Sequence, residues 1–191
     1  MECIRKIQHN GLQVQGGFIV GFDSDNETIF KSMIKFIQES GIVAAMVGLL
    51  NAPKGTQLYK RLKGEGRITE SFSGNNTDLS INFSPKMNLD TLINGYRHII
   101  DAIYSPRYYY ERVINFLKEF RPSNFDKQHF NFTQIGAFIK ANFYLGFIEK
   151  ERKYYWRLFF WSMFRRPKSF PLAITLAIYG YHFRKIFEEY A

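Results

Sequence analysis

The chain has 191 residues, 46% of them hydrophobic and 18% aromatic, which excludes wholesale disorder and fits one domain or two small ones. Its formal charge of +9 favours acidic partners, whether nucleic acid, anionic lipid or protein, and leaves the fold open. Cys3 is the only cysteine, which excludes a disulfide framework and a metal site built from cysteines.

The first third of the chain alternates between predicted helices and strands. Residues 1–10 have the pattern of an amphipathic helix that ends at Gly11. The stretch "LQVQGGFIVGF" then predicts a strand whose apolar second half is buried on both faces. Ser24 and Glu27 have the spacing of a capping box, which predicts that the next helix begins there and continues to Gly41.

A second apolar run, "IVAAMVGLLNA", predicts another strand, and "TQLYKRL" predicts a short helix after it. Because helices and strands alternate with short connections, we expect two adjacent parallel strands, near residues 14–22 and 43–50. Two strands alone leave unpaired edges, so this α/β segment, residues 1–70, is expected to be part of a larger sheet.

The rest of the chain, residues 71–191, is predicted to be a mainly helical module. A polar linker is expected over residues 69–84. Asn88 is expected to cap the first helix, and Ser105 the second, with Pro106 in its first turn. Further helices are expected near residues 133–145, 150–164 and 171–189. The chain as a whole is therefore expected to be predominantly helical.

Two turns of the α/β segment carry polar residues of the kind that ligand sites use. Asp23 and Asp25 in "GFDSD" have the chemistry of a general base or a metal site, and the loop "NAPKGT" presents Lys54. Acidic residues also favour a helix N-terminus, so we favour a structural role for "GFDSD". For "NAPKGT" a ligand contact and ordinary Pro-x-Gly turn chemistry are equally good explanations. The four histidines lack the spacing of metal ligands.

Basic and aromatic residues are interleaved over residues 150–168. This pattern is typical of a helix that lies on an anionic membrane, but a helical pair with a solvated basic side explains it equally well. We favour the helical pair, so peripheral membrane contact is the less favoured alternative, and no nucleic-acid partner is expected. With no secretory signal and an interrupted longest apolar stretch, residues 170–183, we expect a soluble cytoplasmic protein.

The segments "GLQVQGGFIVGFDSD" and "GLLNAPKGTQLYKRLKGEGRI" together resemble the closing strands of the radical S-adenosylmethionine (radical SAM) barrel. The group they resemble carries an N-terminal cobalamin-binding domain and a helical C-terminal domain of unknown function, DUF4070. The stretch "NFSPKMNLDTLINGYRHIIDAIYSPRYYYERV" is similar to the start of that helical module. The resemblance implies that residues 1–70 are the last βα units of a partial TIM-like barrel and residues 71–191 the accessory module.

The resemblance also implies cofactors and a site. Full-length relatives hold a four-iron, four-sulfur (4Fe-4S) cluster through a CxxxCxxC loop and cleave S-adenosylmethionine with it; some cobalamin-dependent relatives transfer methyl groups. By motif, Gly17, Ile19 and Gly21 match the strand that packs beside the adenine, with glycine at 21 letting the backbone approach the adenosine. Leu50 and Asn51 match the end of the next strand, where backbone groups meet the same adenosine.

The departures from the family pattern decide the functional prediction. One cysteine cannot supply three cluster ligands, and the early strands and the cobalamin domain have no counterpart in the sequence. We therefore expect a truncated radical SAM protein without catalytic or metal-binding residues, which holds no cofactor and is inactive alone. One alternative is a non-enzymatic binding module that acts through its basic aromatic surface. The other is the C-terminal half of a split enzyme, whose partner is the missing cluster-bearing half.

Overall fold

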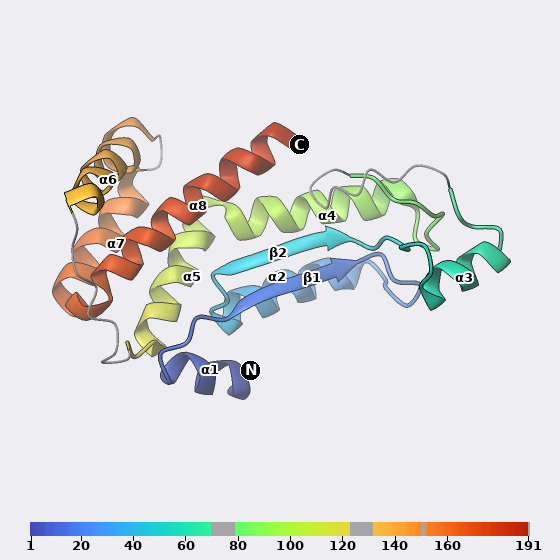
Figure 1. The fold of residues 1–191 in the computed structure, drawn as a ribbon, viewed down its shortest axis with the longest axis horizontal. Helices are drawn as coiled ribbons and strands as arrows, with labels where there is room; N and C mark the ends of the chain where they lie inside the picture. Colours follow the sequence, from blue (N-terminus) through green and yellow to red (C-terminus); the bar gives the residue numbers. More distant parts are fainter. Residues whose placement is uncertain (70–78, 123–131, 150–151, 191) are drawn as a thin grey trace.

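The computed structural model describes residues 1–69, 79–122, 132–149 and 152–190, and helices predominate in it, as predicted. Figure 1 shows a small sheet in the middle of the molecule, with helices around it and a group of helices at one end. The elements in chain order are α1 (Glu2–His9), β1 (Gln15–Val20), α2 (Thr28–Ser40), β2 (Ala44–Leu49), α3 (Gln57–Gly64), α4 (Leu89–Tyr104), α5 (Pro106–Glu119), α6 (Phe132–Phe143), the π-helix η1 (Tyr144–Ile148), α7 (Arg152–Arg165), the 3-10 helix η2 (Pro167–Ser169) and α8 (Phe170–Tyr190).

The two strands are parallel, as the alternation of elements predicts. They pair in register from Gln15 opposite Ala44 to Val20 opposite Leu49, and α2 makes the connection between them. The five helices predicted after Asn88 are also present, with ends that differ by a few residues. The prediction of a helix–strand–helix–strand–helix order for the first third is therefore confirmed.

One face of the sheet is covered and the other is largely open, so the prediction of burial on both faces is wrong. Val20 and Val47 on the covered face belong to one hydrophobic core with residues of α2 and α4. These helices approach closely, since a side chain on Gly95 of α4 would overlap the Phe30 ring of α2. On the opposite face, Met46 is 61% exposed, because among the described helices α8 alone reaches that face, at the amino end of the strands.

The predicted helix caps are only partly correct. Helix α2 begins at Thr28, and Ser24 lies exposed in the preceding turn instead of forming a capping box with Glu27. The Asn26 side chain takes that role in part, because its Oδ1 accepts a hydrogen bond of 3.0 Å from the Thr28 amide. Asn88 does cap α4, by accepting from the Thr91 amide at 3.1 Å.

The second predicted cap also fails, because the hydroxyl of Ser105 donates back to the Ala102 carbonyl, 2.8 Å away, and does not cap α5. Pro106 is in the first turn of α5, as predicted.

The end of the predicted linker packs against the α/β segment. Residues 70–78, which include the predicted boundary between residues 70 and 71, lie outside the described residues, so the division of the chain stays a prediction. The end of the stretch returns to the α/β segment, where Phe83 forms an antiparallel bridge with Ile68. The Thr69 amide donates to the Asn82 carbonyl at 2.8 Å, and the Ser84 amide donates to Arg67.

A buried arginine joins the helices to the sheet. Arg112 of α5 is 1% exposed, and its guanidinium donates to the Ile103 carbonyl at 2.9 Å, the Val43 carbonyl at 3.3 Å and the Gln38 side chain. The rings of Tyr104 and Tyr109 lie 6.0 and 5.3 Å from its central carbon. Burial lowers the pKa of Arg112 to about 10. Neutral carbonyls and ring faces therefore stabilise this charge, with no carboxylate among its described partners.

We predict that Arg112→Lys lowers the free energy of unfolding by about 2–4 kcal/mol, because one ammonium cannot replace a planar donor fork that reaches three elements. The matched control is Arg107→Lys in the same helix, where the side chain is 69% exposed and pairs only with Glu111. That control should change stability by less than about 0.5 kcal/mol. Urea unfolding followed by circular dichroism measures both changes in stability. Equal effects would contradict the conclusion that Arg112 connects the helices to the sheet.

Candidate functional site

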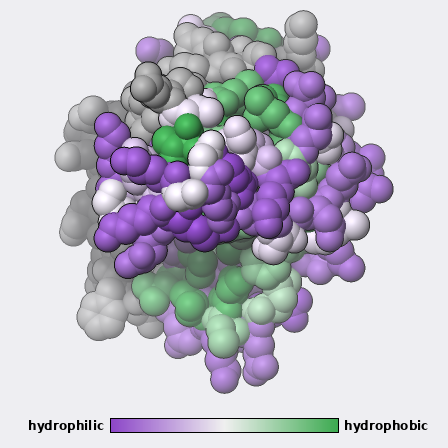
Figure 2. All heavy atoms as spheres, turned by 90° about the vertical axis from the view of Figure 1, so that its right-hand side faces the viewer, coloured by the Kyte–Doolittle hydropathy of each residue, from purple (hydrophilic) through white to green (hydrophobic). Residues whose placement is uncertain are grey.

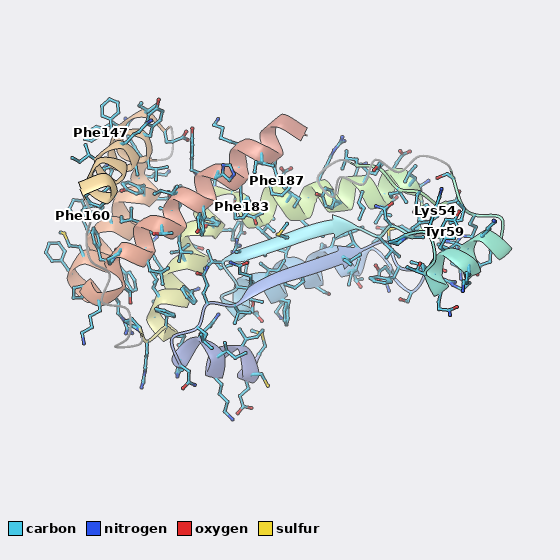
Figure 3. All side chains as sticks on the ribbon, in the orientation of Figure 1. Lys54, Tyr59, Phe147, Phe160, Phe183 and Phe187 are labelled. Atoms are coloured by element: carbon cyan, nitrogen blue, oxygen red, sulfur yellow. The ribbon has the colours of Figure 1, made fainter. Side chains whose placement is uncertain are left out.

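The candidate site lies where β1 and β2 end side by side. The Leu50 amide donates to the Val20 carbonyl at 2.8 Å, which carries the parallel pairing one residue past β2. Lys54 and Tyr59 lie at this end of the molecule in Figure 3, and Figure 2 shows it face-on, as a mainly hydrophilic surface with hydrophobic atoms beside it. The carboxyl ends of parallel strands are where α/β proteins place ligands.

Two of the predicted site residues, Gly17 and Ile19, are on the open face of the sheet. They lie opposite Met46 and Gly48 of β2. No atom lies within 4 Å of the position that a Cβ would take on Gly17 or on Gly48. Ile19 is 49% exposed. The two glycines and the exposed apolar side chains therefore leave a shallow open surface that leads to the strand ends.

Gly21 and Leu50 are next to each other but face the protein interior. Gly21 has φ +106°, and a Cβ on it would lie 3.1 Å from Cδ2 of Leu92, on the covered side of the sheet. Leu50 is buried in a second, small core with Ala52, Leu62 and Phe83. The backbone conformation of Gly21 and the contact with Leu92 require glycine there for structural reasons, and the expectation that glycine at 21 also serves close approach of a ligand stays a prediction.

Asn51 is tied to the segment that returns from the predicted linker. Its Nδ2 donates to the Ser80 carbonyl at 3.1 Å, and its Oδ1 accepts from the Asn82 amide at 3.0 Å. Asn82 in turn bonds both backbone groups of Ala52, at 2.8 and 2.7 Å. Within the described part of the chain, the backbone amide of Asn51 has no hydrogen-bond partner. It is thus a hydrogen-bond donor at the strand ends that the described residues leave without a partner.

The acidic residues of the turn after β1 are both used by the fold. The Asp23 carboxylate pairs with Arg67 and with Arg61, each at 2.7 Å, and Glu65 bridges the same two arginines. The two guanidinium groups hold the pKa of Asp23 well below its usual range. A carboxylate that stays ionised between two arginines is a poor proton acceptor, so Asp23 is structural, as favoured from the sequence.

Asp25 closes the turn. Its Oδ2 accepts from the backbone amides of Gly21 and Phe22, at 2.9 and 3.0 Å. These bonds satisfy the amides that would otherwise point out of the end of β1. Both hydrogen bonds of Asp25 therefore stabilise the end of β1. Neither is made to the N-terminus of α2, where the sequence predicts a role for Asp25.

Sequence reasoning missed three residues that build the strand ends: Arg61, Arg67 and Asn82. Their partners lie 38, 44 and 30 residues away, so no local spacing signals them. Among the described residues, no group of three or more histidine, cysteine or acidic side chains could hold a metal ion.

Comparison with known proteins places most of the chain in one family. The family model described as "Domain of unknown function (DUF4070)" matches residues 56–191. The match begins at the N-cap of α3 and continues through the helices that follow the sheet.

Two curated proteins are similar to this chain, and the match to the first covers the strands as well. The "Uncharacterized methyltransferase sll1242" of Synechocystis sp. (strain ATCC 27184 / PCC 6803 / Kazusa) is 28% identical over 187 residues, which cover 95% of this chain and 34% of that protein. The "Hopanoid C-2 methylase" of Rhodopseudomonas palustris (strain TIE-1) is 35% identical over 68 residues, 36% of this chain and 13% of that protein. The chain thus spans about a third of the length of the Synechocystis relative. No solved structure matches the chain significantly.

We predict that Asp23→Asn lowers the free energy of unfolding at neutral pH by about 1–2 kcal/mol, because it removes one of the two carboxylates, Asp23 and Glu65, that pair with Arg67, which is 16% exposed. The depressed pKa of Asp23 sets the pH dependence. The contribution is complete above the unfolded carboxyl pKa of about 3.9 and is lost as the pH falls through the lower folded value. Denaturant unfolding should therefore show the difference between parent and variant narrowing below about pH 4. If the difference in free energy of unfolding between parent and variant stays constant with pH, the ion-pair explanation is refuted. The control is Asp101→Asn, which changes an exposed carboxylate.

The glycines of β1 give a second prediction. Gly21→Ala should lower the free energy of unfolding by about 1–3 kcal/mol, because alanine is strained at φ +106° and its methyl group meets Leu92. Gly17→Ala should leave the free energy of unfolding unchanged or raise it by up to about 1 kcal/mol, because the new methyl group lies in open space within a strand. Thermal unfolding of the two single variants makes the comparison. If both cost the same, the assignment of Gly21 to the interior is wrong.

Proposed function

The chain belongs to the DUF4070 family, and we propose that it supplies one side of the S-adenosylmethionine site of a larger radical SAM methyltransferase. One observation carries the proposal: the paired ends of β1 and β2 adjoin an open sheet face, in a chain that aligns over 95% of its length with a protein named a methyltransferase. In this interpretation β1, α2, β2 and α3 are the last βα units of a barrel. The missing strands would complete it.

The open face has the chemistry that an adenosine needs. A flat ring can lie against Gly17 and Gly48, because no atom occupies the space above either glycine. Ile19 offers an exposed apolar contact beside them. The unpaired Asn51 amide offers a hydrogen-bond donor at the strand end, and Gly21 and Leu50 hold that end in place from the interior. This support is a surface and one donor, which is part of a binding site.

The described residues do not fit the iron–sulfur cluster of the family. A four-iron cluster takes thiolate ligands at most or all of its irons, and Cys3 is the only cysteine of the chain. Cys3 is exposed and belongs to α1, which precedes β1 in the chain. It is therefore not part of the loops that follow the carboxyl ends of the strands. We therefore assign no step of the chemistry to this chain. Cluster ligands, and any cobalamin site, belong to another region of the protein or to a second chain.

We predict that the purified chain, treated anaerobically with iron and sulfide, gains no absorbance of a four-iron cluster and does not cleave S-adenosylmethionine. The reason is the number of thiolates. Iron and sulfide content per chain measures the first expectation and release of 5′-deoxyadenosine the second. A stoichiometric cluster on this chain alone would contradict the proposal.

The binding test supplies the missing part. The chain is co-expressed with the part of the Synechocystis methyltransferase that lies outside the match, and binding of radiolabelled S-adenosylmethionine to the copurified complex is measured by equilibrium dialysis. Ile19→Trp, which fills the open face, should weaken binding roughly tenfold or more. Leu12→Trp is the matched control, because Leu12 is also exposed, at 61%, but precedes β1. Equal binding by Ile19→Trp and the parent, or a complex that does not bind, would refute the proposed site.

A further inference from the structure

We propose that the helical end of the molecule binds the surface of an anionic lipid bilayer through an exposed aromatic face. This aromatic face consists of large hydrophobic residues of α6, η1 and α7: Ile139, Phe143, Tyr144, Phe147, Ile148, Phe160 and Phe164. Phe164 is 75% exposed and Phe147 63%. Figure 3 shows Phe147 and Phe160 at the end of the molecule opposite Lys54 and Tyr59, so the face is remote from the strand ends.

The aromatic face is continuous. Ring centroids follow one another at 6.4 Å from Tyr144 to Phe143, 6.2 Å from Phe143 to Phe147 and 5.8 Å from Phe147 to Trp156. Trp156 already belongs to α7, and it stacks on Phe160 of the same helix at 5.6 Å. Phe164 lies one helical turn beyond Phe160. Single exposed hydrophobic residues are normal on a soluble protein, but a contiguous patch marks an interaction surface.

The fold holds the aromatic face from behind and does not use its outer side. The indole nitrogen of Trp156 donates to the Gly146 carbonyl at 2.9 Å, and a side chain on Gly146 would overlap that indole. Tyr155, on the inner side of α7, donates to Asn142 of α6 at 2.7 Å. The aromatic side chains are therefore presented on a packed support, so their exposure does not come from a loose helix.

The charge around the face matches anionic lipid. Residues 132–170 contain eight Lys and Arg against two Glu, so this stretch carries +6 of the net +9 of the chain. Lys153 and Arg157 are exposed and, at helical spacing, lie on the same side of α7 as Phe160. No described carboxylate lies within ion-pair distance of Arg157 or Arg165. Unpaired cations beside aromatic and aliphatic groups are the combination that seats a helix at the headgroup level.

Other occupants fit less well. A second copy of the chain would bring two faces of the same strong positive charge together, which opposes a symmetric dimer. Insertion across the bilayer is not the mode either, since no described helix has the length and apolarity to span it. The contact would lie in the plane of the membrane surface, with the aromatic face at the boundary of headgroups and acyl chains. A membrane contact thereby takes the place of the solvated helical pair that the residue pattern alone favours.

The test uses the tryptophans as reporters. Trp161→Phe leaves Trp156, whose ring contacts Phe147 and Phe160 of the aromatic face, as the only tryptophan. Addition of phosphatidylcholine vesicles that contain phosphatidylglycerol should shift its emission to shorter wavelength, and brominated acyl chains should quench it. Vesicles of phosphatidylcholine alone, or high salt, should weaken binding roughly tenfold or more, because the cations then contribute little. Cosedimentation of the full chain measures the affinity independently.

A matched pair of triple variants assigns the binding to the face. Phe147→Ser with Phe160→Ser and Phe164→Ser should abolish cosedimentation. Leu12→Ser with Phe22→Ser and Leu89→Ser removes three exposed hydrophobic residues from other elements and should not reduce it. Circular dichroism checks that both variants fold. The proposal is overturned if the parent fails to bind anionic vesicles, if both variants bind equally, or if size exclusion without lipid shows a dimer that only the first variant separates.

Discussion

The structure depends on a charge held inside it without a counter-charge. Arg112 reaches α2, the residue before β2 and the end of α4 at once, and the two tyrosine rings beside it exclude water. The same tyrosines extend the joint outward: the Tyr104 hydroxyl donates to the Ala45 carbonyl and the Tyr109 hydroxyl to the Leu176 carbonyl, both at 2.7 Å. Sheet, crossover helix and C-terminal helix therefore share one polar centre within an otherwise hydrophobic core.

The contacts of Arg112, Tyr104 and Tyr109 explain how a sheet of two strands is stable with one face open. An isolated two-stranded sheet is marginal in water, and here both outer edges lack a neighbouring strand within the described residues. Helices on the covered face supply the missing stability, through the core and through the bonds of Tyr104 and Arg112 to β2 and the residue before it. The open face is thereby released from a structural role. No described side chain covers Gly17 or Gly48 on that face.

The sequence predicts local features well and distant ones poorly. The parallel pair, the helix order and the Asn88 cap follow from periodicity and spacing, and the structure confirms them. The Ser24 cap fails because Asp25 and Asn26 occupy the turn with bonds of their own. Nothing local in the sequence connects Asp23 with Arg67, or Ala52 with Asn82, since these pairs form only after a 30–44-residue excursion of the chain. The site residues matched by resemblance divide between the open face and the interior, a distinction that depends on which side the helices cover.

The positions of Tyr104 and Arg112 along the chain have a consequence for biosynthesis. The hydroxyl that holds the Ala45 carbonyl belongs to a residue made 59 positions later, and the guanidinium that holds Val43 comes 69 positions later. Both strands therefore leave the ribosome before the groups that fix them exist. The neighbouring helices α4 and α5 contact each other locally and can fold as soon as they emerge. The sheet therefore lacks these two stabilising contacts until α4 and α5 have been synthesised.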